Sequence, residues 1–283
     1  MAPASGGSWG TDSEREPRVA AVTGASAGVG RAIAVALGSI GWTVALGARR
    51  VDRLDETAAE VTAAGGTPIV HPLDVTDPDA VDRFFDAVGS AAGGPATVLV
   101  NNAGLGYLGA IAETTVDRLR AAVDTNLLGV LYCTRRAAAD MLRAGTDGDL
   151  VFITSDSVHK PYPHMLTYGA TKAAVEYLAA GLDVELAGTG IRSTIVRLGP
   201  TVSEFNTGWT DEDMIGFMQA WERLGIREDF NYIPAEAAAH AVVTAVTAPR
   251  GTKVSLLSVR PEATLDQDER TKWSTAASQG RGD

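Results

Sequence analysis

The feature that most constrains the fold is a regular alternation of short β-branched runs with longer alanine-rich stretches of helical period. The pattern predicts seven strands, at residues 19–23, 43–46, 67–71, 98–101, 150–154, 191–196 and 254–259. Between them it predicts helices at residues 29–40, 51–64, 77–90, 116–144, 168–187 and 234–248. Strands that alternate with helices pair in parallel through right-handed crossovers. The strands are almost wholly apolar, which is typical of burial on both faces. The sequence therefore predicts an α/β fold: a doubly wound, seven-stranded parallel sheet with helices on both faces.

The predicted elements form a single domain at residues 18–260. Residues 1–17 and 261–283 are polar and lack periodicity, so we expect both ends to be disordered. The 24 Lys and Arg side chains against 35 Asp and Glu give a net charge of −11, which excludes nucleic acid as an expected partner.

The apolar segments and the single cysteine bear on where in the cell the protein is expected to be. Residues 1–17 have no apolar core of the kind that a signal peptide needs. The uncharged stretch at residues 32–48 is interrupted by Gly38 and Gly41, so we expect no membrane span. Cys133 has no partner for an internal disulfide, and we expect it to be a small buried hydrophobe. These features favour a cytoplasmic protein.

A glycine-rich turn joins the first predicted strand to the first predicted helix. Glycines let the backbone approach a pyrophosphate closely, and free N–H groups at the helix start bind its charge. An ordinary glycine turn is the alternative, but the position between strand and helix favours a dinucleotide site. The expected cofactor-binding residues of this turn are Gly24, Ser26, Ala27, Gly28, Val29 and Gly30.

The order Thr-Gly-x-x-x-Gly-x-Gly, beginning at Thr23, resembles the signature of the short-chain dehydrogenase/reductase family, whose fold is Rossmann-like. The resemblance implies two further groups of cofactor-binding residues. After the third strand, one group lies at the family position for the adenine amine. After the fourth, the other closes the cofactor pocket. The group after the third strand is Asp74 and Val75, and the group after the fourth strand is Asn102, Ala103 and Gly104. Asp74 could equally cap the helix expected to begin near Asp77.

The second predicted strand is followed by Arg49 and Arg50, where an NAD-specific dinucleotide fold places an acidic residue on the ribose 2′-hydroxyl. Guanidinium groups bind phosphate bidentately, whereas an Asp would repel it. The pair therefore favours NADP(H) over NAD. A solvated basic pair at the start of a helix is the alternative, although it does not explain the missing acid.

Tyr168 and Lys172 are four residues apart, so a phenol and an ammonium lie on one helical face one turn apart. A nearby cation stabilises a phenolate, and lowering the pKa of tyrosine from ~10 to about 7 requires roughly 4 kcal/mol. Alone, such a pair is common on protein surfaces. Ser155 lies 13 residues upstream, which matches the family spacing for the serine that binds the substrate oxygen. Asn126 matches the fourth catalytic position, where the resemblance implies a side chain that holds a water on the lysine.

The segment after the sixth strand departs from the family. The family usually has Pro-Gly there, whereas this chain has Leu198 before Gly199. We expect Gly199, Thr201 and Ser203 to contact the cofactor, although hydroxyls in loops are often turn formers.

A substrate-binding insert is expected at residues 203–232, because ligands of doubly wound sheets bind beyond the carboxyl ends of the strands. Its expected substrate residues are Phe205, Trp209, Phe217 and Trp221, and Phe230 and Tyr232 add two more aromatic rings. The alternative is a packing or subunit-contact helix, because Met214, Phe217, Met218 and Trp221 recur at helical spacing.

The resemblance implies an NADP(H)-dependent oxidoreductase that interconverts a ketone and a secondary alcohol on a hydrophobic small molecule, with Tyr168 moving the proton. Two alternatives remain: a non-catalytic NADP-binding sensor or scaffold, and a reductase of carrier-bound acyl chains. We expect no metal, because Asp156, His159 and His164 share no ligand spacing. The long helices at residues 116–144 and 168–187 favour a homodimer or homotetramer.

Overall fold

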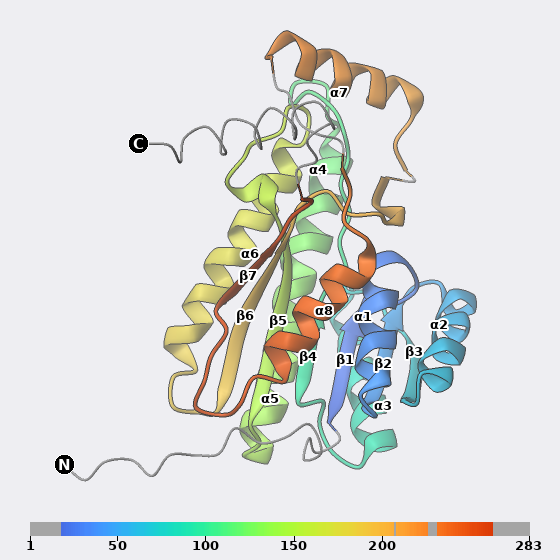
Figure 1. Cartoon of the computed structure of the whole chain (residues 1–283), viewed down its shortest axis with the longest axis vertical. Helices are drawn as coiled ribbons and strands as arrows, with labels where there is room; N and C mark the ends of the chain where they lie inside the picture. Colours follow the sequence, from blue (N-terminus) through green and yellow to red (C-terminus); the bar gives the residue numbers. More distant parts are fainter. Residues whose placement is uncertain (1–17, 207, 226–230, 263–283) are drawn as a thin grey trace, which may run out of the picture.

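The seven strands form one sheet in the order β3-β2-β1-β4-β5-β6-β7, and every neighbouring pair is parallel (Figure 1). Their bounds are β1 Val19–Thr23, β2 Thr43–Ala48, β3 Thr67–Pro72, β4 Val98–Asn101, β5 Gly148–Ser155, β6 Ile191–Leu198 and β7 Leu256–Val259. The predicted doubly wound α/β fold is confirmed. The predicted strand bounds differ from the observed ones by at most two residues at either end, with two-residue differences at β2, β5, β6 and β7.

The computed structural model describes residues 18–206, 208–225 and 231–262. Residues 1–17 and 263–283, where we expected disordered ends, lie outside the described residues. So do residues 207 and 226–230 of the predicted insert, including Phe230.

The helices are α1 Gly28–Ser39, α2 Val51–Ala63, α3 Pro78–Ala92, α4 Val116–Val123, α5 Gly129–Ala144, α6 Leu166–Glu185, α7 Asp211–Arg223 and α8 Ala235–Val246. The predicted helix at residues 116–144 is helical throughout, but a π-helical turn at Asp124–Leu128 separates α4 from α5. α7 lies at the top of the view in Figure 1, away from the helices that flank the sheet. None of the described helices is long and apolar enough to cross a membrane.

Two apolar layers cover the sheet. On one face, α1, α2 and α8 pack through a cluster that includes Ile33, Leu54 and Val242. On the other face, α3, α5 and α6 pack through a cluster that includes Phe84 and Cys133. Cys133 is fully buried, as predicted, and burial raises the pKa of its thiol to about 12. Two-sided burial explains why the strands are apolar at nearly every position.

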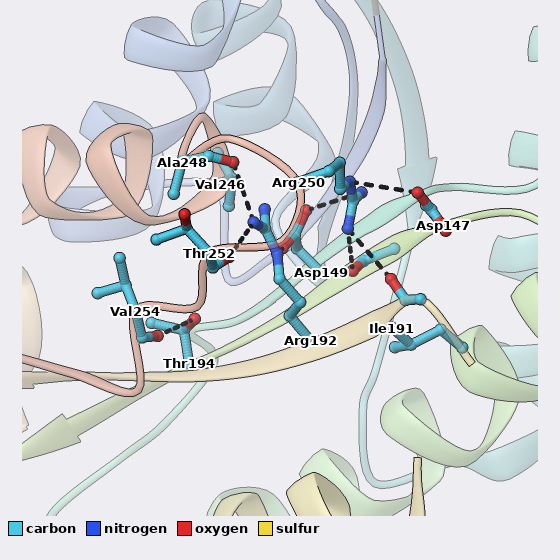
Figure 2. Close-up of polar contacts among 12 residues, drawn as sticks. Asp147, Asp149, Ile191, Arg192, Thr194, Val246, Ala248, Arg250, Thr252 and Val254 are labelled. Atoms are coloured by element: carbon cyan, nitrogen blue, oxygen red, sulfur yellow. Dashed lines mark hydrogen bonds and ion pairs between the residues drawn. The ribbon is translucent and has the colours of Figure 1, made fainter. Parts of the chain in front are cut away.

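A polar network lies at the amino end of β5, around the buried carboxylate of Asp149 (Figure 2). Arg18 and Arg192 donate to its two oxygens at 2.6 and 2.7 Å, and Arg250 lies 3.5 Å away. Arg192 also donates to the carbonyls of Ala248 and Thr252 at 2.9 and 2.8 Å. The network therefore holds the connection from α8 to β7 in place. It lies at the end of the sheet away from the carboxyl ends of the strands.

The order of the strands reverses between β1 and β4. The chain runs from β1 outward through β2 to β3, and then returns to the other side of β1 with β4. The loops that follow β1 and β4 therefore diverge at the carboxyl edge of the sheet. Open α/β sheets bind their ligands in the crevice at such a point.

Candidate active site

Ser155, Tyr168 and Lys172 come together at the carboxyl end of β5. Ser155 is the last residue of that strand, and Tyr168 lies in the first turn of α6. The two side chains form a hydrogen bond. The Nζ atom of Lys172, one helical turn later, lies 5.8 Å from the centroid of the Tyr168 ring and donates to the carbonyl of Ile153 at 2.9 Å. The structure thus groups the three residues that the sequence predicted as catalytic.

Burial shapes the electrostatics of this group. It raises the pKa of Tyr168 to about 12; the hydrogen bond from Ser155 opposes the shift, and the negative charge of Asp156 adds to it. It lowers the pKa of Lys172 to about 8, because a buried ammonium is poorly solvated. Without a bound cofactor, the phenol is therefore held as a neutral proton donor.

Asn126 lies in the π-helical turn and is fully buried. Its Oδ1 accepts from the backbone N–H of Leu105 at 2.8 Å, and its Nδ2 donates to the carbonyl of Leu105 and to Thr171 Oγ1 at 2.8 and 3.1 Å. Both N–H groups of the amide therefore have protein acceptors. Asn126 connects α6 to the loop after β4, and π-helical turns are frequent at functional sites.

Asn102 and Thr23 hold the glycine turn against the loop after β4. Asn102 Nδ2 donates to the carbonyl of Thr23 at 2.9 Å, and Thr23 Oγ1 accepts from the N–H groups of Asn102 and Ala103 at 3.0 Å each. A Cβ atom on Gly30 would collide with the Gly24 carbonyl and with the Asn102 amide. Glycine at position 30 is therefore required for this close approach.

The start of α1 is suited to binding an anion. Its N-cap residue, Ala27, makes no side-chain hydrogen bond to the helix, and no acidic residue lies in the first turn. The backbone N–H groups there have no side-chain cap, and the helix dipole favours negative charge. Gly28, with φ of 53°, supplies the left-handed backbone that the turn requires. The chemistry of this donor set fits a pyrophosphate.

The two arginines predicted to bind a 2′-phosphate interact with different groups: Arg50 forms hydrogen bonds, and the charge of Arg49 acts on the carboxyl of Asp74. Arg50 donates to Ser26 Oγ at 3.2 Å and to Glu204 at 3.0 Å. Burial opposes ionisation of Asp74, but hydrogen bonds from Thr76 and the charge of Arg49 outweigh it and lower the pKa of the carboxyl.

The alternative role for Asp74, as the helix cap, is wrong. Its carboxylate accepts from the N–H and hydroxyl of Thr76 at 3.0 and 2.8 Å. Asp77 caps α3 instead, by accepting from the N–H of Asp79 at 2.9 Å. Val75, next to Asp74, is buried where α5 approaches at Gly129.

The hydroxyl groups of the segment after β6 form hydrogen bonds within local turns. Thr201 donates to the carbonyl of Gly199 at 2.8 Å, and Ser203 accepts from the N–H of Phe205 at 3.3 Å. The segment lies close to the glycine turn, since a Cβ on Gly28 would be 3.2 Å from the Ser203 Cβ. It also brings the Phe205 ring to 4.9 Å from the ring of Tyr168.

Two of the predicted substrate aromatics, Phe217 and Trp221, are buried in a packed cluster with Leu108. The Trp221 ring stacks on Tyr162 at 5.3 Å, and Tyr162 donates to Asp156 at 2.9 Å. Burial, followed by the charge of Asp156 and this hydrogen bond, raises the pKa of Tyr162. Trp209 joins the rim of the cluster and donates to the carbonyl of Gly106 at 2.8 Å. These contacts agree with the packing interpretation of α7.

A surface pocket beside Tyr168 has a lining that the sequence did not predict. It includes Tyr107, Ile111, Arg118, His164 and Leu166. These residues come from the loop after β4, from α4, from the segment before α6 and from the first residue of α6. No spacing in the sequence connects them. Across the described residues, no group of three His, Cys, Asp or Glu side chains is arranged to hold a metal ion.

Fold and site together define a doubly wound α/β protein with a Ser-Tyr-Lys group at the carboxyl edge of its sheet. Residues 18–213 match the family model of short chain dehydrogenases, and the chain belongs to this family of oxidoreductases.

Curated relatives cover most of this chain. Dehydrogenase/reductase SDR family member 11 of Gallus gallus is 33% identical over 251 residues, which span 86% of this chain and 96% of that protein. Glycine betaine reductase ATRR of Emericella nidulans is 33% identical over 244 residues, or 86% of this chain. The chain spans only 19% of the length of that reductase.

Among solved structures, an alcohol dehydrogenase from the archaeon Thermococcus sibiricus, complexed with 5-hydroxy-NADP, is similar with a TM-score of 0.74 and 30% identity. The match covers 88% of this chain and all of that one.

Proposed function

We propose that the protein is an NADP(H)-dependent oxidoreductase that interconverts a ketone and a secondary alcohol on a hydrophobic small molecule. The observation that carries the proposal is the contact of Ser155 with Tyr168, one helical turn from the buried ammonium of Lys172. A proton donor, a hydrogen-bonding hydroxyl and a cation in this arrangement serve proton transfer to and from an alkoxide oxygen.

Each residue has a distinct part in the proposed reaction. A bound nicotinamide supplies the hydride in reduction and accepts it in oxidation. Tyr168 gives its proton to the carbonyl oxygen in reduction and takes it back in oxidation. Ser155 hydrogen-bonds the same oxygen, and the Lys172 ammonium stabilises the phenolate that Tyr168 becomes. Asn126 positions the loop after β4 beside the lysine.

Cofactor binding is assigned to the glycine turn, to the start of α1 and to the two arginines after β2. The uncapped N–H groups of α1 would hold the pyrophosphate. Arg49 and Arg50 would pair with a 2′-phosphate, because they occupy the position where an acid would select NAD. The 5-hydroxy-NADP complex of the similar alcohol dehydrogenase supports this choice.

We also propose that the protein is a cytoplasmic homodimer or homotetramer. Tyr177 and Val184 on α6 are 84% and 80% exposed. These large apolar side chains support a contact between α6 helices of two copies.

The test is a panel of carbonyl compounds and alcohols, followed by nicotinamide absorbance with NADP(H) and NAD(H) in parallel. We expect turnover of an apolar ketone or secondary alcohol, with NADP(H) preferred. Cofactor binding without turnover of any panel member would favour the sensor or scaffold, and preference for NAD(H) would contradict the assignment of Arg49 and Arg50.

A further inference from the structure

The pocket beside Tyr168 combines an apolar wall with a cationic group. Tyr107, Ile111 and Leu166 contribute apolar surface, and Arg118, His164 and Thr167 contribute polar groups. Tyr168 lines the same pocket, so these groups lie beside the proposed catalytic tyrosine.

Arg118 enters the pocket from the first turn of α4. Its guanidinium lies 5.2 Å from the centroid of the Tyr107 ring, and its side chain is 38% exposed. Its nearest carboxylate is that of Asp213, with Nη1 and Oδ1 3.8 Å apart. Throughout the described ranges the guanidinium meets no acceptor at hydrogen-bonding distance, whereas Arg197 donates to Glu176 at 2.6 and 2.8 Å. The stacking on Tyr107 therefore orients a cation whose donors are available to a ligand.

The Asp213 side chain is held in place by contacts other than the one with Arg118. It belongs to the capping box of α7, where its Oδ2 accepts from the N–H of Thr210 at 2.9 Å and its own N–H donates to Thr210 Oγ1 at 3.1 Å. The hydrogen bonds with Thr210 lower the pKa of the Asp213 carboxyl, and the Arg118 charge adds less. A ligand anion could therefore replace Asp213 at Arg118 while α7 keeps its cap.

We propose that this pocket binds a carboxylate, and that the substrates are carbonyl compounds or alcohols with an apolar body and a carboxylate at the end remote from the reacting carbon. The inference rests on the proposed function and specifies its substrate class. A planar guanidinium matches a carboxylate with two parallel hydrogen bonds. The chain carries a net charge of −11, so a local cation is needed to attract an anionic substrate.

The first test measures binding by calorimetry to the NADP⁺-loaded protein, which cannot reduce a ketone, with 4-acetylbenzoate and its neutral counterpart 4-methylacetophenone. We expect the carboxylate to bind about tenfold more tightly, the scale of a charge-assisted contact that is partly exposed. Arg118→Gln should abolish the preference. Arg120→Gln removes the same charge two residues along α4, at a residue that does not line the pocket, and should retain it.

Asp213→Asn gives a gain-of-function arm. Asn can still cap α7 but does not compete for the guanidinium, so the carboxylate should bind about two- to fivefold more tightly to this variant. Equal affinity of the wild-type protein for the two compounds, or a preference that survives Arg118→Gln, would overturn the proposal. Melting temperatures of all variants establish that they are folded.

Turnover separates this inference from the proposed function. The catalytic efficiencies for reduction of 4-acetylbenzoate and 4-methylacetophenone by NADPH should differ in the same direction as the affinities. If no carbonyl compound is reduced, the proposed function fails, while binding to the cofactor-free protein still reports on Arg118. If both ketones are reduced with equal efficiency and bind equally, the oxidoreductase assignment stands and the carboxylate site is refuted.

Discussion

Arg50 and Glu204, which are 154 positions apart in the chain, form an ion pair of 3.0 Å beside the glycine turn. The same guanidinium donates to Ser26 within the turn. A 2′-phosphate paired with Arg50 would therefore compete with Glu204 for the guanidinium.

Replacing Glu204 with Gln should strengthen NADPH binding. Both side chains of the pair are about half exposed, so the competing interaction is worth at most about 1 kcal/mol, or roughly fivefold in affinity. Fluorescence titration should show tighter NADPH binding and unchanged NADH binding. Glu212→Gln, which neutralises an acid in the first turn of α7, is the matched control. Weaker NADPH binding by Glu204→Gln would show that the carboxylate assists the cofactor.

Arg49→Ala should weaken NADP(H) binding by about ten- to a hundredfold, because a charge-assisted contact to phosphate is worth about 1.5–3 kcal/mol. NAD(H) binding should change little. Arg53→Ala, in the first turn of α2, removes an equal charge and should have a smaller effect on both cofactors. Equal losses for NADP(H) and NAD(H) would refute the role of Arg49.

Tyr168→Phe should lower turnover by at least about a hundredfold, because it removes the proton donor. Cofactor binding should survive in calorimetry, since the phenol oxygen is not expected to anchor the cofactor. Tyr177→Phe, an exposed tyrosine of the same helix, controls for the substitution itself. Near-normal turnover by the purified Tyr168 variant would sink the catalytic assignment.

Lys172→Met should stabilise the cofactor-free protein at neutral pH. Burial lowers the pKa of Lys172 to about 8, below its value in the unfolded chain, so the charged form opposes folding. Between about pH 8 and 10 the unfolded chain holds a proton that the folded state has released, and stability therefore rises with pH. At about 1.36 kcal/mol per pKa unit, the cost below pH 8 is of order 3 kcal/mol. Denaturation of the wild type and the variant from pH 7 to 10 should give curves that converge as pH rises. A difference in the free energy of unfolding that stays constant with pH would contradict the lowered pKa of Lys172.

Trp221→Ala should destabilise the fold by about 3–5 kcal/mol, because the side chain is buried against Tyr162 and Phe217. Met218→Ala, at an exposed position of the same helix, should cost much less. The melting temperature and the KM values for small and bulky ketones distinguish packing from substrate contact. A raised KM for bulky ketones alone, with an unchanged melting temperature, would show that Trp221 lines the substrate site.

The catalytic group was predictable because its members are fixed by local geometry. A spacing of four residues puts Tyr168 and Lys172 on one face of any helix, and Ser155 ends a strand that the apolar pattern identifies. The partners of Asn126 were not predictable. Its contacts with Leu105 and Thr171 join segments that come together only because β4 lies beside β5 in the sheet.

The sequence by itself determined the order of strands and helices, the glycine turn and the Ser-Tyr-Lys group, because each is encoded by periodicity or by short spacing. Only the tertiary structure decided which aromatics pack and what lines the pocket. Phe217 and Trp221 look like substrate contacts in the sequence, but Leu108 and Tyr162 cover them. Arg118 reaches the surroundings of Tyr168 because α4 packs against α6. Such contacts depend on how separate elements meet in space, which no local pattern of residues specifies.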